Sequence, residues 1–189
     1  MPLRQTVAST EEPLTLDEAK AHLRVDFTSE DSYISALIAA ARGWIEKECA
    51  LALITQEWAL TLDAFPSGTA PIELKIAPLI SVDSIKYTPL GEGEKTWAAA
   101  NYAVDIYGRP ARIVPVSAWP ADQLVALNGV TVAMTCGFGA AAAVPDVIKE
   151  ALRLLVGYWY LNREDSRLPE RVRTAVFALL AKQRPIGVA

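Results

Sequence analysis

The sequence predicts an α+β protein in which a discontinuous four-helix domain carries an inserted antiparallel β block. Two changes in hydrophobic period support this prediction. Apolar residues recur at three- and four-residue spacing up to about Cys49, alternate with polar residues over 55–136, and return to helical spacing from Pro145. We therefore expect two structural units, a discontinuous helical domain at 1–54 and 145–189 and a β-rich insertion at 55–144.

The first two helices are predicted from a capping signal and an apolar stripe. Thr15 opens the sequence TLDE, a capping box in which the Thr15 hydroxyl accepts the backbone N–H of Glu18 and the Glu18 side chain reaches back. The helix that follows should end near residue 24. A longer amphipathic helix should run from about Ser29 to Cys49, because its apolar residues form one continuous stripe.

The middle of the chain is predicted to form about six short strands. Segments such as TQEWALTLD, ARIVP and VTVAMTC have strand-like composition, and the turn signals FPSG, PLGEG and YGRP separate such segments. The strands should be antiparallel and packed like a sandwich or barrel. The glycines of CGFGA, after the last strand, should permit a turn with positive φ that joins the β block to the next helix.

Two further helices are predicted after the β block. Pro145 suits the first turn of a helix because it lacks an N–H group that would be unpaired there. In the helix that follows, polar residues occupy an arc of roughly 100° and apolar residues an arc of roughly 200°. Such a wide apolar arc suits contacts with a neighbouring subunit as well as its own core. A last helix should begin at Pro169 and end before Pro185.

The charges are distributed unevenly along the chain. Residues 1–144 carry 10 basic and 17 acidic side chains, whereas residues 145–189 carry 8 basic and 5 acidic ones. An acidic body argues against wrapping nucleic acid, which requires clustered Lys and Arg on the binding face. The basic C-terminal part could still touch DNA or an acidic protein.

The sequence offers no recognisable catalytic, cofactor or metal motif. His22 is the single histidine, and Cys49 and Cys136 lack the spacing of a metal or redox pair. The CGFGA stretch lacks the third glycine of a dinucleotide-binding turn. No apolar run approaches the roughly 18 residues of a membrane span. We expect neither an enzyme, a cofactor, a metal nor a membrane partner.

Several stretches together resemble a known family. They are PLTLDEAKAHLRVD before a long helix, IYGRPARIVPVSAWP in the strand block, the TCGFG turn, VPDVIKEALRLLVGYWYLNRED, and the final RVRTAVFALLAKQRP. In this order the sequence resembles the phage head–tail connector proteins of the gp6-like and phiE125 gp8-like group, also called adaptor or head-completion proteins, which have relatives in gene transfer agents. The resemblance covers nearly the whole chain.

The resemblance implies a structural protein of the virion neck, assembled in the host cytoplasm. It implies a ring of identical subunits, usually dodecameric, docked beneath the portal protein and extending the DNA channel without sequence-specific binding. A downstream neck or tail component, a stopper or a tail terminator, would be the next partner. The alternative is another neck protein, such as a tail-completion or tail-terminator protein, and an unrecognised enzyme is the third hypothesis.

The resemblance also suggests where partners bind, since the C-terminal segment of relatives reaches the portal. The predicted portal interface consists of Arg163, Arg167, Arg171, Arg173, Lys182, Arg184, Pro185 and Ile186. The predicted subunit-packing residues are Leu154, Tyr158 and Leu161. An alternative interpretation is that the arginines are only the solvated faces of two helices.

Overall fold

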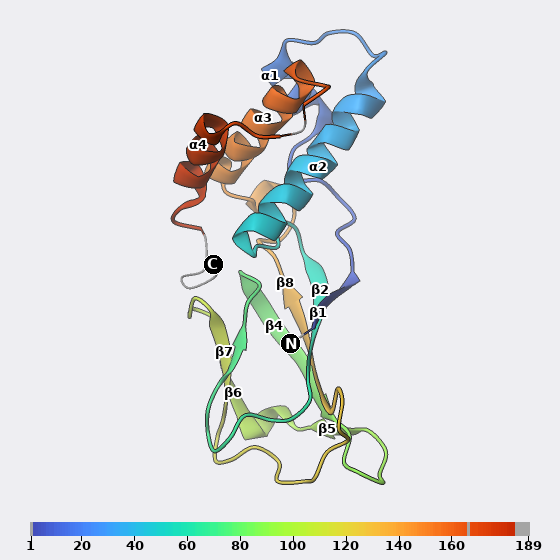
Figure 1. Cartoon of the computed structure of the whole chain (residues 1–189), viewed down its shortest axis with the longest axis vertical. Helices are drawn as coiled ribbons and strands as arrows, with labels where there is room; N and C mark the ends of the chain where they lie inside the picture. Colours follow the sequence, from blue (N-terminus) through green and yellow to red (C-terminus); the bar gives the residue numbers. More distant parts are fainter. Residues whose placement is uncertain (1, 166, 184–189) are drawn as a thin grey trace.

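The helices and the strands occupy opposite ends of an elongated molecule (Figure 1). The computed structural model describes residues 2–165 and 167–183. Within them, four α-helices and two antiparallel sheets confirm the predicted α+β class. The two helices that precede most of the β block in sequence pack against the helices that follow it. The helical part is therefore assembled from both ends of the chain.

The four helices lie close to their predicted positions. Their bounds are α1 (Leu16–Leu23), α2 (Asp31–Cys49), α3 (Asp146–Leu161) and α4 (Glu170–Leu180). The capping box at the start of α1 is confirmed: Glu18 N donates to Thr15 Oγ1 at 3.1 Å, and Thr15 N donates to Glu18 Oε2 at 2.8 Å. Helix α3 contacts α1, α2 and α4, so it is the central helix of the group.

The β block contains one large and one small sheet. The five-stranded sheet has the order β1-β2-β8-β4-β5, and the three-stranded sheet has the order β3-β7-β6. The strands are β1 (Leu3–Val7), β2 (Gln56–Leu62), β3 (Ile72–Leu74), β4 (Leu79–Tyr87), β5 (Lys95–Trp97), β6 (Tyr102–Asp105), β7 (Ala111–Pro115) and β8 (Val130–Cys136). The short strands β1 and β5 were not predicted from the sequence.

Buried apolar side chains form two clusters. One gathers side chains of the four helices and of their flanking segments, including Ile34, Leu152 and Val176. The other fills the β block, where Val132 and Ile113 are fully buried. Strand β1 pairs with β2 in the larger sheet, although residues 1–54 were expected to belong to the helical unit. The division into domains at residues 54 and 145 stays a prediction.

Hydrogen bonds tie the two clusters together where α2 meets the β block. The Glu46 carboxylate on α2 accepts Leu53 N at 2.9 Å and Gln56 Nε2 at 2.8 Å, so the buried Gln56 amide is satisfied. Gly137, in the turn after β8, has φ of 133°, and a Cβ there would lie 2.5 Å from Ile54 O. The predicted positive-φ turn is confirmed, and it is packed closely against the chain that leaves α2.

Candidate interaction surfaces

The apolar arc of α3 is used mainly inside its own subunit. Ile148, Ala151 and Leu155 are fully buried against the other helices. Among the predicted subunit-packing residues, Leu154 is partly buried against the helical cluster, and Tyr158 donates its hydroxyl to Arg167 O at 3.1 Å. Leu161 is different: it is 79% exposed at the end of the helix. It is the predicted packing residue whose side chain remains available to a neighbour.

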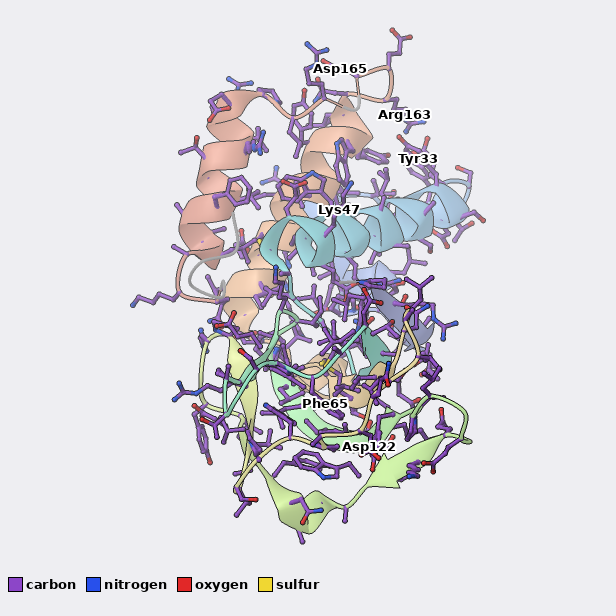
Figure 2. The ribbon with its side chains drawn as sticks, turned by 60° about the horizontal axis from the view of Figure 1, so that its bottom comes forward. Tyr33, Lys47, Phe65, Asp122, Arg163 and Asp165 are labelled. Atoms are coloured by element: carbon purple, nitrogen blue, oxygen red, sulfur yellow. The ribbon has the colours of Figure 1, made fainter. Side chains whose placement is uncertain are left out.

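Arg163 belongs to a network of polar and aromatic groups that joins α2 to the end of α3. Its Nη2 lies 2.6 Å from Glu30 Oε1, and its guanidinium carbon lies 4.8 Å from the centre of the Tyr33 ring and 5.0 Å from that of Tyr160. Arg163 and Tyr33 are seen together at the helical end of the molecule (Figure 2). The arginine that was predicted to bind a partner therefore already has one within its subunit.

Hydrogen bonds within this network shift the pKa values of its groups. The hydroxyl of Tyr160 donates to Glu30 Oε2 at 2.5 Å, and this bond, with the one from Arg163, lowers the pKa of the Glu30 carboxyl from its ordinary value. The same hydrogen bond to Glu30 raises the pKa of Tyr160. The carboxylate is therefore held in its charged form. The sequence did not identify Glu30 and Tyr33 as partners of Arg163 because they lie far from it in the chain. Tyr160 lies close to Arg163 in the sequence, but an aromatic residue at the end of a helix is typical of a core position.

The basic residues of α4 and the loop before it differ in their surroundings. Arg173 faces Glu48 at 3.6 Å and lies over the Phe177 ring, 5.4 Å from its centre. Arg167 and Arg171 are exposed. An exposed arginine keeps its planar fork of donors for a carboxylate on another molecule. Arg167 and Arg171 therefore fit the predicted interface better than Arg163 does.

The predicted interface ends in the C-terminal segment. Lys182 is exposed, and its carbonyl accepts Arg109 Nη1 from the β block at 2.7 Å. Arg184, Pro185 and Ile186 lie outside the described residues. The bond from Arg109 places the loop between β6 and β7 beside the end of α4. The YGRP motif that contains Arg109 was interpreted as a turn signal and as part of the family resemblance, not as a contact with the C-terminal segment.

A cluster of aromatic side chains occupies the end of the β block away from the helices. The rings of Phe65 and Trp119 stack with their centres 5.3 Å apart, and Trp97 lies 5.1 Å from Trp119. Trp119 is 6% exposed, and its Nε1 donates to Ala70 O at 2.9 Å. Figure 2 shows Phe65 and Asp122 at this end, opposite Arg163. A satisfied, mostly buried cluster of this kind serves packing.

Metal-ligand clusters and the buried Cys136 thiol were the features of interest for chemistry among the described residues. Among them, no group of three or more His, Cys, Asp or Glu side chains could hold a metal ion. Burial raises the pKa of the Cys136 thiol to about 12, so this sulfur stays protonated at neutral pH. In the same part of the chain, no helix is long and apolar enough to cross a bilayer.

Comparison with known proteins points to one family. The model of the phage gp6-like head-tail connector protein family matches residues 13–87, which include α1, α2 and the strands β2, β3 and β4. No curated protein matches the chain in sequence.

Solved structures extend the similarity to the whole chain. A chain in the neck of an empty GTA particle, computed with C6 symmetry, has a TM-score of 0.83 and 26% identity, and the match covers 100% of this chain and 98% of that chain. A chain from the virion of a native gene transfer agent (GTA) particle has a TM-score of 0.84 and 27% identity at the same coverage. A chain in the neck of a native GTA particle, computed with C12 symmetry, has a TM-score of 0.75 and 27% identity, again over 100% and 98% of the two chains.

Proposed function

We propose that this chain is a head–tail connector of the gp6-like kind, which joins the parts of a phage or gene transfer agent neck. It is a structural neck protein, and the observation that carries this conclusion is the end-to-end match with neck chains. The C6 and C12 symmetries of those necks support a ring of identical subunits. In such a ring each subunit uses two different surfaces, one for each neighbour.

The ring docks on the portal protein through the basic C-terminal part of the chain. Arg167 and Arg171 are exposed and can form bidentate pairs with portal carboxylates, and Lys182 lies where the chain leaves α4. The ring surrounds a channel through which DNA passes. The acidic body of the protein supports this role, because like charge discourages adhesion of the DNA backbone. A stopper or tail terminator binds the opposite side of the ring.

A binding assay with isolated portal protein tests this interface. The variant that carries both Arg167→Glu and Arg171→Glu should bind portal several-fold more weakly at low salt, with a smaller effect at high salt because ions screen exposed charges. The matched control is Lys47→Glu, which reverses an exposed charge on α2. Figure 2 labels Lys47 on that helix.

Deletion of residues 182–189 provides the second arm of the test. It should abolish portal binding without changing the thermal unfolding of the helical part. Full binding by the truncated chain would contradict the assignment of the C-terminal segment to the portal. Binding to tail tube instead of portal would identify a tail terminator.

A further inference from the structure

The loop between β6 and β7 has a fixed shape and touches the C-terminal end of α4. The Asp105 carboxylate accepts Tyr107 N at 3.2 Å and Gly108 N at 2.9 Å, and it pairs with Arg112 Nε at 3.0 Å. These bonds hold the loop so that Arg109 Nη1 reaches Lys182 O at 2.7 Å. The end of the β hairpin and the end of α4 therefore form one continuous surface, which we call the β6–β7 corner (Ile106, Tyr107, Arg109 and Lys182).

This corner exposes apolar surface above a small cavity. Tyr107 is 90% exposed and Ile106 is 42% exposed, although both are large apolar or aromatic side chains. The cavity beneath them has a volume of about 150 Å³ and is lined by both residues together with Pro78, Phe138 and Gln183. A cavity of this size accepts a group about as large as benzene. It therefore has room for one apolar side chain.

The position of the cavity restricts what can fill it. Gln183, which lines it, is followed by six residues in the sequence. A fully extended segment of this length spans at most about 20 Å. Any partner held by residues 184–189 therefore lies within reach of Tyr107. A partner that binds the C-terminal segment is therefore brought close to this cavity.

The charges of the corner specify the chemistry of that partner. Arg109 and Lys182 supply two positive charges, whereas the nearby Asp105 carboxylate is occupied by Arg112 and by the loop amides. A guanidinium group has five N–H donors, and the bond to Lys182 O uses one of them. Tyr and Arg are the residue types that dominate the binding energy of protein interfaces. The corner suits an acidic protein surface that presents an apolar side chain.

We propose that an acidic segment of the portal protein docks on the β6–β7 corner, packs against the Tyr107 ring and places one apolar side chain in the cavity beneath it. Arg109 has two roles, since it faces the portal carboxylates and orients the end of α4 through Lys182. This inference rests on the proposed binding of the C-terminal segment to portal. The inference extends the proposed portal interface from the helical part, to which it was first assigned, to the loop between β6 and β7 in the β block.

Photocrosslinking with full-length protein tests the proposal directly. With p-benzoylphenylalanine in place of Tyr107, illumination in a mixture with purified portal protein should give a crosslink to portal. The matched control carries the same group in place of Leu127, which is 73% exposed in the segment before β8. A crosslink from position 107 to a second copy of this chain, or to its own C-terminal segment, would overturn the proposal, as would no crosslink at all.

Affinity measurements separate this inference from the proposed function. Tyr107→Ser and Arg109→Ala should each weaken portal binding tenfold or more, whereas Leu127→Ser and the exposed Arg4→Ala should change it less than twofold. If deletion of residues 182–189 abolishes binding while Tyr107→Ser and Arg109→Ala bind normally, the proposed function stands and the corner is not part of the interface. If the deletion has no effect, the proposed function itself fails.

Discussion

Leu152 and Leu161 allow the same substitution to be made on α3 in two opposite environments. Leu152 is 0% exposed in the helical cluster, whereas Leu161 is 79% exposed at the end of the helix. We predict that Leu152→Ala destabilises the subunit and that Leu161→Ala leaves its stability almost unchanged but weakens ring formation. The pair separates the role of α3 in the fold from its role in assembly.

The expected magnitudes follow from burial. Replacing a fully buried leucine with alanine costs about 2–5 kcal/mol, because apolar contacts are lost and a cavity remains. Full burial of a leucine side chain is worth about 1.5–3 kcal/mol. Since only about a fifth of Leu161 is covered, its truncation should cost the isolated subunit about 0.5 kcal/mol. If a neighbour covers the rest, each ring contact should lose about 1–2.5 kcal/mol.

Two measurements check these values. Urea unfolding at a concentration where the chain is monomeric gives the stability loss, and negative-stain electron microscopy of mixtures with portal protein gives the fraction of complete rings. Leu127→Ala is the control for an exposed leucine far from the helices, and it should change neither quantity. Equal destabilisation by Leu152→Ala and Leu161→Ala would refute the assignment of their environments. Normal rings with Leu161→Ala would remove Leu161 from the subunit interface.

The network at the end of α3 and the buried thiol in β8 give two further predictions. Because the pKa of Glu30 is lowered in the folded state, its stabilising effect is present above its ordinary pKa of 4.5 and is lost as the pH falls through the lowered value. The difference in thermal stability between wild type and Glu30→Gln should thus be clear at pH 7 and disappear in acid; a constant difference would show that the Glu30 charge is not its cause. Since the pKa of Cys136 is raised to about 12, its alkylation at pH 8 should be slow in the folded protein and fast in urea. A Cys136→Ser variant separates its signal from that of Cys49, and rapid labelling of folded Cys136 would contradict its burial.

Much of the fold could be predicted because its signals are local. The capping box lies within four residues, and β7 and β8 begin and end where the strand-like segments ARIVP and VTVAMTC do. Strand β5, with three residues, is too short to show an alternating pattern. Strand β1 has a mostly exposed burial pattern, so no apolar alternation distinguishes it from a loop.

The contacts that define the surfaces could not be predicted in this way. Arg163 meets Glu30 across 133 residues, and Arg109 meets Lys182 across 73. Neither pair has a sequence spacing from which contact follows, because the pairing depends on how α2, α3 and the β block pack. Composition correctly marked the C-terminal part as basic, but it could not tell an arginine bound within the subunit from one left exposed.

The packing of α3 also bears on how the ring forms. The wide apolar arc of this helix was expected to serve both its own core and a neighbour, yet α1, α2 and α4 all contact it, and its central apolar residues are fully buried. The subunit therefore completes its core before it meets another copy. We expect contacts between copies to use small exposed groups such as Leu161, and such contacts bind weakly one at a time. A subunit of this kind should remain folded alone and assemble when many copies are held side by side. A ring already present on the particle would provide that arrangement.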